Sequence, residues 1–265
     1  MLKEKAKNIR KNILRIAHSS KGPHTGTALS CVDILSVLYF DTLNIASFDD
    51  ENRDIFILSK GHGAMALYAT LYEKEYLSKS DFFSYYQDSG SLPAHLDKET
   101  SEAIEISSGS LGHGLPQALG FAYSKKLKNL ESKVYVLMGD GETQEGSIWE
   151  AAMLAPKMNL DNLVVFIDRN NLQGYGRPSE LVSFEPIDEK FQSFNWDVYR
   201  VDGHDVDAIK KAIDSPSEKP KMIICDTIKG KGVSFMEDEM KWHYFIVTDE
   251  FLAEGLEELE SRDEK

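Results

Sequence analysis

The feature that most constrains the fold is a pair of buried strand patterns joined by a single helical pattern. Residues 133–140 (KVYVLMGD) and 162–171 (NLVVFIDRNN) are apolar runs that end in polar residues, which is typical of strands covered on both faces. Residues 147–160 (SIWEAAMLAPKMNL) lie between them and have the length of a helix. This order predicts a βαβ unit, whose two parallel strands end at the same edge of a sheet.

Two polar residues follow these strands at the edge where open α/β sheets bind ligands. Asp140 lies between two glycines, and Asn170 begins an Asn-Asn pair. Either motif alone is common in turns, but the two after successive strands are more specific. A carboxylate, an amide oxygen and a backbone carbonyl suit Mg²⁺ and leave coordination positions for two diphosphate oxygens. The pattern therefore predicts a site for a metal ion and a diphosphate.

The alternation of strands and helices continues along the chain. Strand patterns cover residues 196–203 and 221–228, and a helix is expected over residues 205–213 with Asp205 as its N-cap. The first half contains four helical patterns, at residues 3–18, 30–43, 64–75 and 117–128. The order predicts an α/β fold, doubly wound, with a mostly parallel sheet and helices on both faces.

Each end of the chain allows two interpretations. The basic pattern at residues 3–18 could belong to a transit peptide, but it contains Glu4 and lacks an apolar core region, which favours an ordinary surface helix. The acidic C-terminal segment predicts either a helix that docks on the domain or on a partner, or a solvated tail. Its apolar residues have helical spacing: Phe251, Leu252, Leu256 and Leu259.

Composition excludes several classes of function. The chain of 265 residues can bury a full core, and its longest apolar runs are far shorter than the roughly 20 residues of a membrane span. Acidic residues outnumber basic ones by 44 to 30, and no Lys/Arg cluster could follow a phosphate backbone. We therefore expect no membrane insertion and no nucleic-acid partner. Cys31 and Cys225 have no metal-binding spacing, and we expect buried thiols in a reducing cytoplasm.

Residues 139–171 resemble the thiamine diphosphate motif, and the opening GDGExxEGxxWEA is similar to its transketolase version. Other segments resemble that family in order along the chain: 24–30 (HTGTALS), 56–62 (FILSKGH), 93–97 (PAHLD), 108–114 (SGSLGHG), 201–205 (VDGHD), 229–232 (KGKG) and 242–243 (WH). So many ordered matches are not expected by chance. The chain thus resembles the thiamine diphosphate-binding part of transketolases over nearly its whole length.

The resemblance implies ligands for a metal ion and for the cofactor. Asp140 and Asn170 would bind the metal, which is Mg²⁺ or alternatively Ca²⁺ or Mn²⁺, through their side chains, and Leu172 would bind it through its carbonyl. Asn170 would thereby also contribute to cofactor binding. The diphosphate would be faced by the backbone of Gly141 and by the side chains of two histidines, His62 and His243.

Two further residues match the family's ring-binding loop. Gly109 and Leu111 would touch the aminopyrimidine and thiazolium rings. Glu145, which the resemblance places with the cofactor-binding residues, and Glu150 match carboxylates near a subunit interface, where they would link paired active sites through shared protons. An alternative for these two glutamates is an ordinary acidic pair at a helix N-terminus, favoured by the macrodipole.

Three histidines are candidates for catalysis by the same resemblance. His24 and His95 would line the substrate channel, donate hydrogen bonds to donor hydroxyls and move protons as a sugar C–C bond breaks. His243 would take part beside the diphosphate. A single histidine is more often structural, but six of the seven histidines fall inside matching motifs. Their occurrence together favours a functional role.

The resemblance also predicts domain organisation and partners. Residues 1–265 are expected to form a single diphosphate-binding (PP) domain. In full-length members a pyrimidine-binding domain follows and supplies a glutamate that activates the cofactor, and no glutamate after Trp242 has a strand-like setting for that role. We therefore expect a partner chain, a C-terminal transketolase subunit, in a cytoplasmic α₂β₂ heterotetramer.

The implied reaction moves a two-carbon ketol unit from a ketose phosphate to an aldose phosphate, as in the pentose phosphate pathway. Several positions depart from the family pattern around the expected sugar channel: Pro23, Thr27, His113, residues 174–176 (GYG) and Tyr244. These departures leave open a transketolase-like paralogue that acts on an unusual sugar in a glycan or secondary pathway. A non-catalytic cofactor-binding subunit is a further alternative, which the intact metal and histidine motifs disfavour. A Rossmann-type dinucleotide enzyme is discounted because no GxGxxG opens a helix after the first strand.

Overall fold

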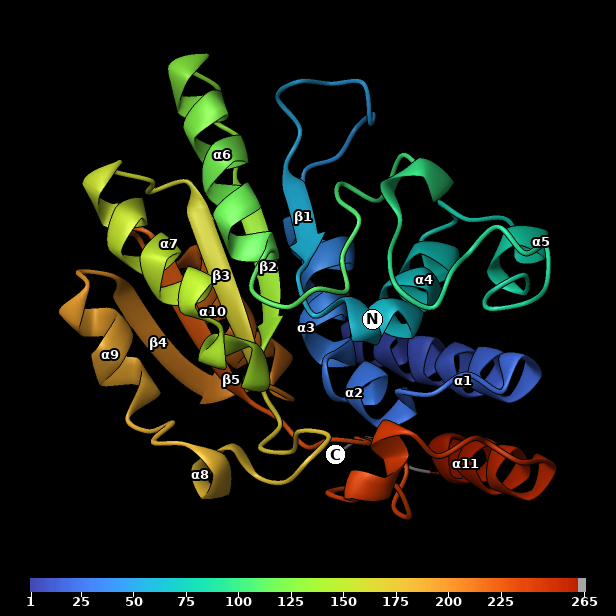
Figure 1. The fold of residues 1–265 in the computed structure, drawn as a ribbon. Helices are drawn as coiled ribbons and strands as arrows, with labels where there is room; N and C mark the ends of the chain where they lie inside the picture. Colours follow the sequence, from blue (N-terminus) through green and yellow to red (C-terminus); the bar gives the residue numbers. More distant parts are fainter. Residues whose placement is uncertain (262–265) are drawn as a thin grey trace.

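The computed structural model describes residues 1–261 and contains a five-stranded, all-parallel sheet in the order β1-β2-β3-β5-β4 (Figure 1). The strands are β1 Ile55–Leu58, β2 Val134–Gly139, β3 Leu163–Arg169, β4 Asp197–Asp202 and β5 Lys221–Asp226. Helix α7 (Gly146–Lys157) connects the adjacent strands β2 and β3. The predicted βαβ unit is therefore confirmed.

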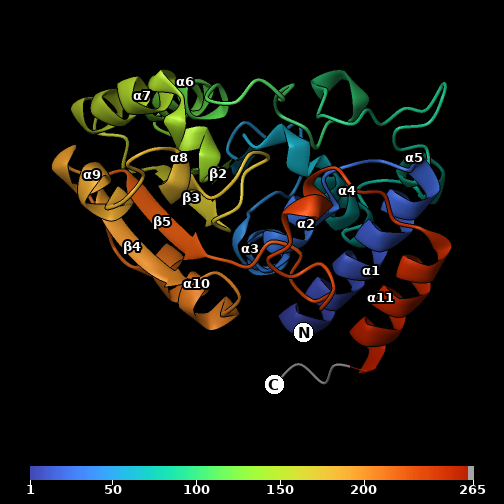
Figure 2. The same ribbon diagram turned by 60° about the horizontal axis from the view of Figure 1, so that its bottom comes forward.

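Helices cover both faces of the sheet, because the inner strands are apolar on both sides. Successive side chains of β2 alternate between two separate apolar clusters: Val134 and Val136 join one, and Tyr135 and Leu137 join the other. The first cluster packs under α6 (Gly114–Leu127), α7 and α9 (Ile187–Ser193). The second packs against α2 (Thr25–Ser30), α3 (Val32–Val37), α4 (Ala64–Glu73) and α10 (Val206–Asp214). Figure 2 shows the sheet between these two layers, which confirms the predicted doubly wound fold.

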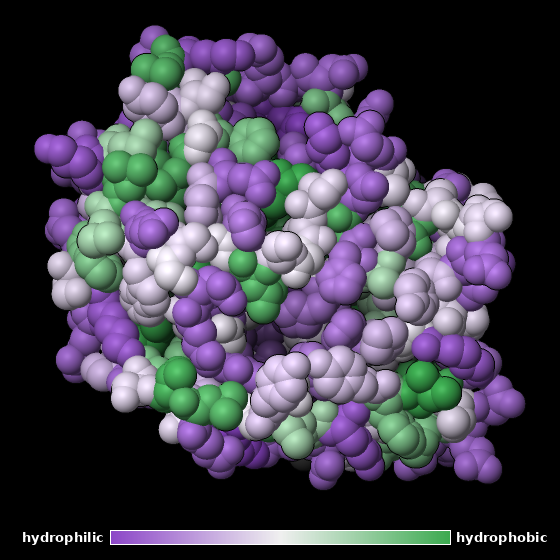
Figure 3. All heavy atoms as spheres, in the orientation of Figure 1, coloured by the Kyte–Doolittle hydropathy of each residue, from purple (hydrophilic) through white to green (hydrophobic). Residues whose placement is uncertain are grey.

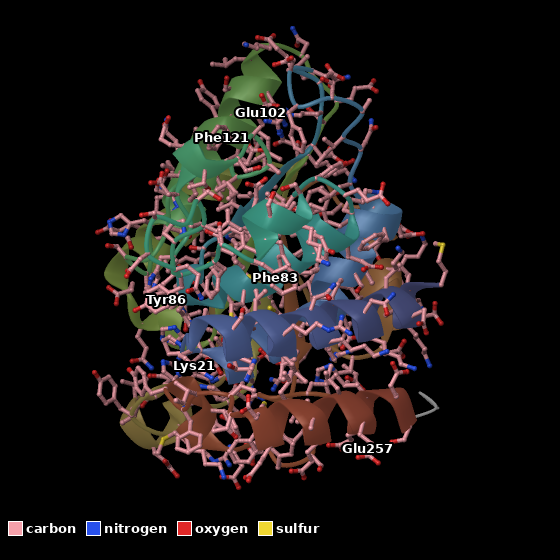
Figure 4. All side chains as sticks on the ribbon, turned by 90° about the vertical axis from the view of Figure 1, so that its right-hand side faces the viewer. Lys21, Phe83, Tyr86, Glu102, Phe121 and Glu257 are labelled. Carbon is pink, nitrogen blue, oxygen red and sulfur yellow. The ribbon has the colours of Figure 1, made fainter. Side chains whose placement is uncertain are left out.

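The first and last described helices pack together outside the second layer. Helix α1 (Leu2–Ser20) and α11 (Asp249–Ser261) lie side by side in Figure 4, with Glu257 on the solvent side of α11. Lys11 of α1 forms an ion pair with Glu260. The docked terminal helix is therefore the correct alternative over residues 249–261, and residues 262–265 lie outside the described residues. Because α11 covers α1, even Lys11 and Asn12 are buried, so α1 is more enclosed than a surface helix.

The first half of the chain differs from the sequence prediction at two places. The helix predicted over residues 30–43 is interrupted at Cys31, and α3 then continues into a π-helical turn, Leu38–Thr42. At this break the Ser30 hydroxyl lies 2.6 Å from Oδ2 of Asp168 and 2.9 Å from the Thr27 carbonyl oxygen, so its one proton is shared between these two acceptors. Strand β1 was not predicted, because its four residues are too few for a period to be visible. The remaining helices, α5 (Lys79–Phe82) and α8 (Pro178–Leu181), are single short turns.

Helix α10 begins as its sequence predicts. The side chain of Asp205 accepts hydrogen bonds from the backbone N–H groups of Asp207 and Ala208 at 3.0 and 3.1 Å. Replacing Asp205 by alanine is expected to lower the free energy of unfolding by about 1 kcal/mol, because two helix N–H groups lose their acceptor. Urea unfolding of the chain measures this change. Asp207→Ala, at an exposed position in the same turn, is the control and is expected to cost less; equal losses would show that the cap contributes nothing.

Both cysteines are buried in the second cluster, as expected for core thiols. Burial raises the pKa of the Cys31 thiol to about 11 and raises that of Cys225 as well. Neither thiol is therefore activated as a nucleophile. Over the described part of the chain, no helix has the length and apolar character needed to cross a membrane.

Candidate functional site

The candidate site lies beyond the carboxyl ends of β1, β2 and β3. Gly139 pairs with Asp168 in the sheet, so Asp140 and Asn170 follow at the same edge. A cavity of about 400 Å³ opens there, and Figure 3 shows the surface hollowed near the tips of these strands. Its lining includes most of the predicted site residues: His24, His62, Gly109, Leu111, Asp140, Gly141, Glu145, Asn170, Leu172 and His243.

Asp140 is only 3% exposed, and backbone hydrogen bonds hold its side chain in place. Its two carboxylate oxygens accept backbone hydrogen bonds from Gly141 and Asn171, both at 2.7 Å. Burial, together with the nearby charge of Asp168, raises the pKa of Asp140 to about 6. A buried carboxylate with a raised pKa is one that a cation would stabilise.

Asn170 is oriented by its neighbours. Its Nδ2 donates to Oδ2 of Asp168 at 3.2 Å, and its Oδ1 accepts from the backbone N–H of Leu172 at 3.1 Å. These two bonds fix which side of the amide carries the oxygen. The carboxylate of Asp140 and the amide oxygen of Asn170 are thus brought to one place, as the sequence predicted.

Asp168 is a fully buried anchor beneath this site. It forms an ion pair with Lys60, and both side chains are completely buried. The Asp168 carboxylate also accepts from the hydroxyls of Ser30, at 2.6 Å, and Thr227. Lys60 additionally donates to the carbonyl of Thr27 at 3.0 Å. The pair joins the ends of β1 and β3 to helix α2 under the cavity floor.

Lys229 is a second buried cation at the site. Its Nζ lies 3.0 Å from the carbonyl oxygen of Leu172 and 2.9 Å from Nδ1 of His243. Burial, followed by repulsion from Lys60, lowers the pKa of Lys229 to about 8, so it is still mainly charged at pH 7. A charged lysine can only donate, which leaves Nδ1 of His243 as the acceptor and places the ring proton on Nε2.

Three histidines gather around His24. Its ring centroid lies 5.1 Å from that of His243, 5.6 Å from His62 and 6.0 Å from His95. Burial lowers the pKa of His24 to about 4 and that of His243 to about 3, and it also holds the pKa of His62 well below its usual value. Three of these imidazoles are therefore neutral at pH 7.

The backbone of His24 is held in an unusual conformation, with φ at 74°. Its N–H donates to the carbonyl of His243 at 2.9 Å, and two residues later the carbonyl of Gly26 accepts from the N–H of Gly230 at 2.8 Å. A left-handed conformation at a residue other than glycine is uncommon and is found at functional sites. These bonds join the first and last motifs of the chain.

Three of the other predicted residues lie outside the cavity lining, and one lies at its rim. His95 is exposed and does not line the cavity; its ring lies beside that of His24 and next to Gly109, where an added Cβ would meet its Cδ2 at 3.2 Å. His113 and Glu150 are exposed and also lie outside the lining. Glu145 is exposed at the rim.

The cavity has the donor set that a diphosphate and a metal ion need. Gln173 Nε2 is buried without a hydrogen-bond partner, and an added Cβ on Gly141 would lie 3.1 Å from it. This unused donor and the charged Lys229 suit an anionic ligand. Among residues 1–261, no group of three His, Cys, Asp or Glu side chains could hold a metal. The predicted metal ligands include only one carboxylate, so the cation would depend on diphosphate oxygens as well.

Sequence reasoning did not assign roles to Lys60, Asp168, Lys229 or Glu142. The two lysines lie inside matched motifs, Lys60 in residues 56–62 and Lys229 in residues 229–232. A lysine and an aspartate flanked by strongly apolar runs are a signal for a buried ion pair. Their partnership is visible only once the strands are placed side by side.

The fold and the site define a parallel α/β protein with a cavity at the carboxyl edge of its sheet, lined by a buried carboxylate, an amide, a lysine and histidines. A sequence model of the transketolase thiamine diphosphate-binding domain matches residues 2–257. The chain belongs to the transketolase family, and it is a transketolase-type subunit with a thiamine diphosphate-binding fold.

Several relatives of similar length are named as subunits. The chain is 40% identical to a subunit of the apulose-4-phosphate transketolase of Actinobacillus succinogenes, over 97% of this chain and 95% of the relative. It is 37% identical to a 6-deoxy-6-sulfo-D-fructose transketolase subunit of a Clostridium species, over 98% and 96%. The structure of Campylobacter jejuni transketolase superposes with a TM-score of 0.91 and 31% identity, covering 98% of this chain but only 42% of that one.

Proposed function

We propose that the chain works with a second polypeptide as a transketolase that transfers a two-carbon ketol unit between sugar phosphates. The observation that carries the proposal is the meeting of Asp140, Asn170, His24, His62 and His243 at one cavity. These residues come from four separate motifs. A fold alone does not define an activity, but this set of metal-binding oxygens and neutral imidazoles suits the family's chemistry.

Each group has a proposed task in holding the cofactor. Asp140, Asn170 and the carbonyl of Leu172 would bind Mg²⁺, or Ca²⁺ or Mn²⁺ in its place. The Leu172 carbonyl already accepts from Lys229, so it would use its second lone pair for the metal. The N–H of Gly141 points at Asp140, so Gly141 would contribute mainly by leaving room for the diphosphate.

Further contacts would complete the cofactor site. The Nε2–H of His243, the side chain of His62 and the free amide of Gln173 would face the diphosphate oxygens. Gly109 and Leu111 would contact the rings, with Glu145 at the rim. Thiamine diphosphate, when bound, supplies the electron sink for breaking a C–C bond beside a carbonyl.

The histidines would handle the substrate's protons. A neutral imidazole can accept a proton from a hydroxyl and return it later, and the lowered pKa of His24 keeps that ring neutral. His24 would act on the substrate directly. His95, which is exposed beside His24, would reach substrate from the outer part of the channel.

We also propose that residues 1–265 form one diphosphate-binding domain and that a C-terminal transketolase subunit supplies the pyrimidine-binding domain and the activating glutamate. The subunit names of the relatives support this division. Large apolar side chains are exposed beside the cavity, at Tyr175, Tyr244 and Phe245, as expected of a face that a partner covers. An α₂β₂ assembly would pair two such sites. The two unpaired thiols suit a cytoplasmic location.

Two classes of sugar are candidates for the substrate. Pentose phosphate pathway sugars are the ordinary substrates of the family. An unusual sugar is favoured by Tyr175 and Tyr244, which line the cavity mouth, and by Thr27 in its wall. The named substrates of two relatives, apulose 4-phosphate and 6-deoxy-6-sulfofructose, are sugars of this second kind.

The decisive experiment is calorimetric titration of thiamine diphosphate and Mg²⁺ into the chain, alone and with the product of the adjacent gene. An assay with xylulose 5-phosphate and ribose 5-phosphate runs in parallel. We expect binding and turnover only when both chains are present, because the rings need the pyrimidine-binding domain. Binding without turnover would favour the unusual-sugar candidate, and the same assay is then repeated with apulose 4-phosphate. Absence of binding with both chains would disprove the site assignment.

A further inference from the structure

A buried glutamate next to the metal site does not take part in the roles assigned so far. Glu142 lies in the short helical turn Gly141–Gln144 and is 1% exposed. Its Oε1 accepts from the Ser59 hydroxyl and from the backbone N–H of Gly112 at 2.9 Å, and its Oε2 accepts from the N–H of Gly139 at 3.2 Å. Both oxygens are therefore used by donors of the protein itself.

These donors belong to three different segments of the cavity wall. Ser59 directly follows β1, Gly139 ends β2, and Gly112 belongs to the loop 108–114. Ser59 also accepts from the N–H of Gly114 at 3.1 Å, which adds a second bond between that loop and the end of β1. One carboxylate thus connects the ends of the paired strands β1 and β2 to loop 108–114.

Gly112 is fixed from its other sides by the segment that contains Glu142. Its carbonyl accepts from the Ser147 hydroxyl at 2.7 Å. Its φ is +80°, and an added Cβ would lie 2.6 Å from Cβ of Glu145. Residues 142–147 therefore enclose Gly112: Glu142 accepts from its N–H, Ser147 donates to its carbonyl, and Glu145 packs against its Cα.

We propose that Glu142 is a positioning residue that sets the place of the ring-binding loop, through Gly112, relative to the metal-binding residue Asp140. The inference rests on the proposed function, since Gly109 and Leu111 on that loop are the proposed ring contacts. Glu142 itself does not bind the cofactor. Its charge matters because a carboxylate can accept from all three donors, whereas an amide turns an N–H group toward at least one of them.

The test compares Glu142→Gln with Asp54→Asn, which changes a buried carboxylate at the opposite edge of the sheet. Asp54 is 7% exposed and accepts backbone hydrogen bonds from Asn44 at 2.9 Å and Lys133 at 2.7 Å, before β1 and β2 begin. Asp54→Asn removes the same kind of interaction from the same strands without touching loop 108–114. Ser59→Ala keeps the carboxylate but removes one donor of Glu142 and, with it, the acceptor of the Gly114 N–H.

Two measurements are made on the full chain. The first is hydrogen exchange over residues 108–114 without any ligand. The second is titration with thiamine diphosphate and Mg²⁺ in the presence of the partner chain. For Glu142→Gln we expect faster exchange in this loop and a loss of cofactor affinity of roughly 10- to 100-fold, as for other residues that orient ligand-binding groups. Ser59→Ala should show both effects to a smaller extent, and Asp54→Asn neither.

Three results would overturn the proposal. They are unchanged exchange in loop 108–114 of Glu142→Gln, wild-type affinity in that variant, or an equal loss of affinity in Asp54→Asn, which would indicate general destabilisation. Failure of the proposed function looks different, because the wild-type pair of chains would then bind no thiamine diphosphate. That result would disprove the proposed cofactor binding, and the role of Glu142 in cofactor binding would be disproved with it.

Discussion

Replacing Asp140 by asparagine is expected to lower the affinity for thiamine diphosphate in the presence of Mg²⁺ by at least about 100-fold. The substitution removes the only carboxylate among the proposed metal ligands, and the amide that replaces it is a much weaker ligand for a hard cation. The side chain is almost fully buried and has the Asp168 charge nearby, so no water-exposed group can take its place. Titration of the two-chain enzyme with the cofactor measures the loss.

Asp202→Asn is the matched control for this prediction. Asp202 ends β4 at the same edge of the sheet and accepts a backbone hydrogen bond from His204 at 2.8 Å, but it lies outside the cavity lining. The affinity of the Asp202→Asn enzyme for the cofactor should stay at the wild-type value. If Asp140→Asn also binds within threefold of wild type, Asp140 is not a metal ligand and the metal site must lie elsewhere.

Replacing Lys60 by methionine is expected to lower the free energy of unfolding by about 3–5 kcal/mol, because Asp168 is then left as a buried charge without its cation. The ion pair is completely buried, so water cannot compensate for the lost partner. Urea unfolding of the chain without ligands measures the effect. The loss would be a large part of the stability of a domain of this size.

Two further variants show whether the loss comes from the unpaired charge. Lys60→Met combined with Asp168→Asn should be more stable than Lys60→Met alone, because no charge remains buried. Lys126→Met breaks an exposed pair with Asp161, where the side chains are 35% and 46% exposed, and should cost no more than about 1 kcal/mol. A cost for Lys60→Met as small as that of Lys126→Met would contradict the buried-charge explanation.

The parts of the fold that the sequence predicts are those whose signals are local. Residues 133–140 and 162–171 are apolar on both faces, so their parallel pairing followed from the run of residues alone. Asp205 caps α10 through bonds to residues two and three positions away, and such bonds depend only on nearby sequence. The meeting of Asp140 and Asn170 followed from one rule about parallel strands.

The remaining features depend on contacts between distant segments. The break at Cys31 occurs where Ser30 reaches Asp168, which is far along the chain, so helical periodicity could not reveal it. Lys60, Lys229 and Glu142 stood inside matched motifs, but a motif does not say which donor meets which acceptor. The roles proposed for the histidines came from resemblance, while their neutral state follows from burial among two lysines, which only the folded structure shows.

The backbone bond between His24 and His243 has a consequence for how the protein is made. A ribosome delivers the chain from its N-terminus at about 5–20 residues per second, so the early motifs emerge well before residue 243. Until then the His24 N–H has no native acceptor, and Gly26 lacks Gly230. The sheet order adds to this delay, because β5 must insert between β3 and β4. His243 can therefore take its place in the cavity wall only after it has been synthesised, and a nascent chain that stops before His243 lacks this part of the wall.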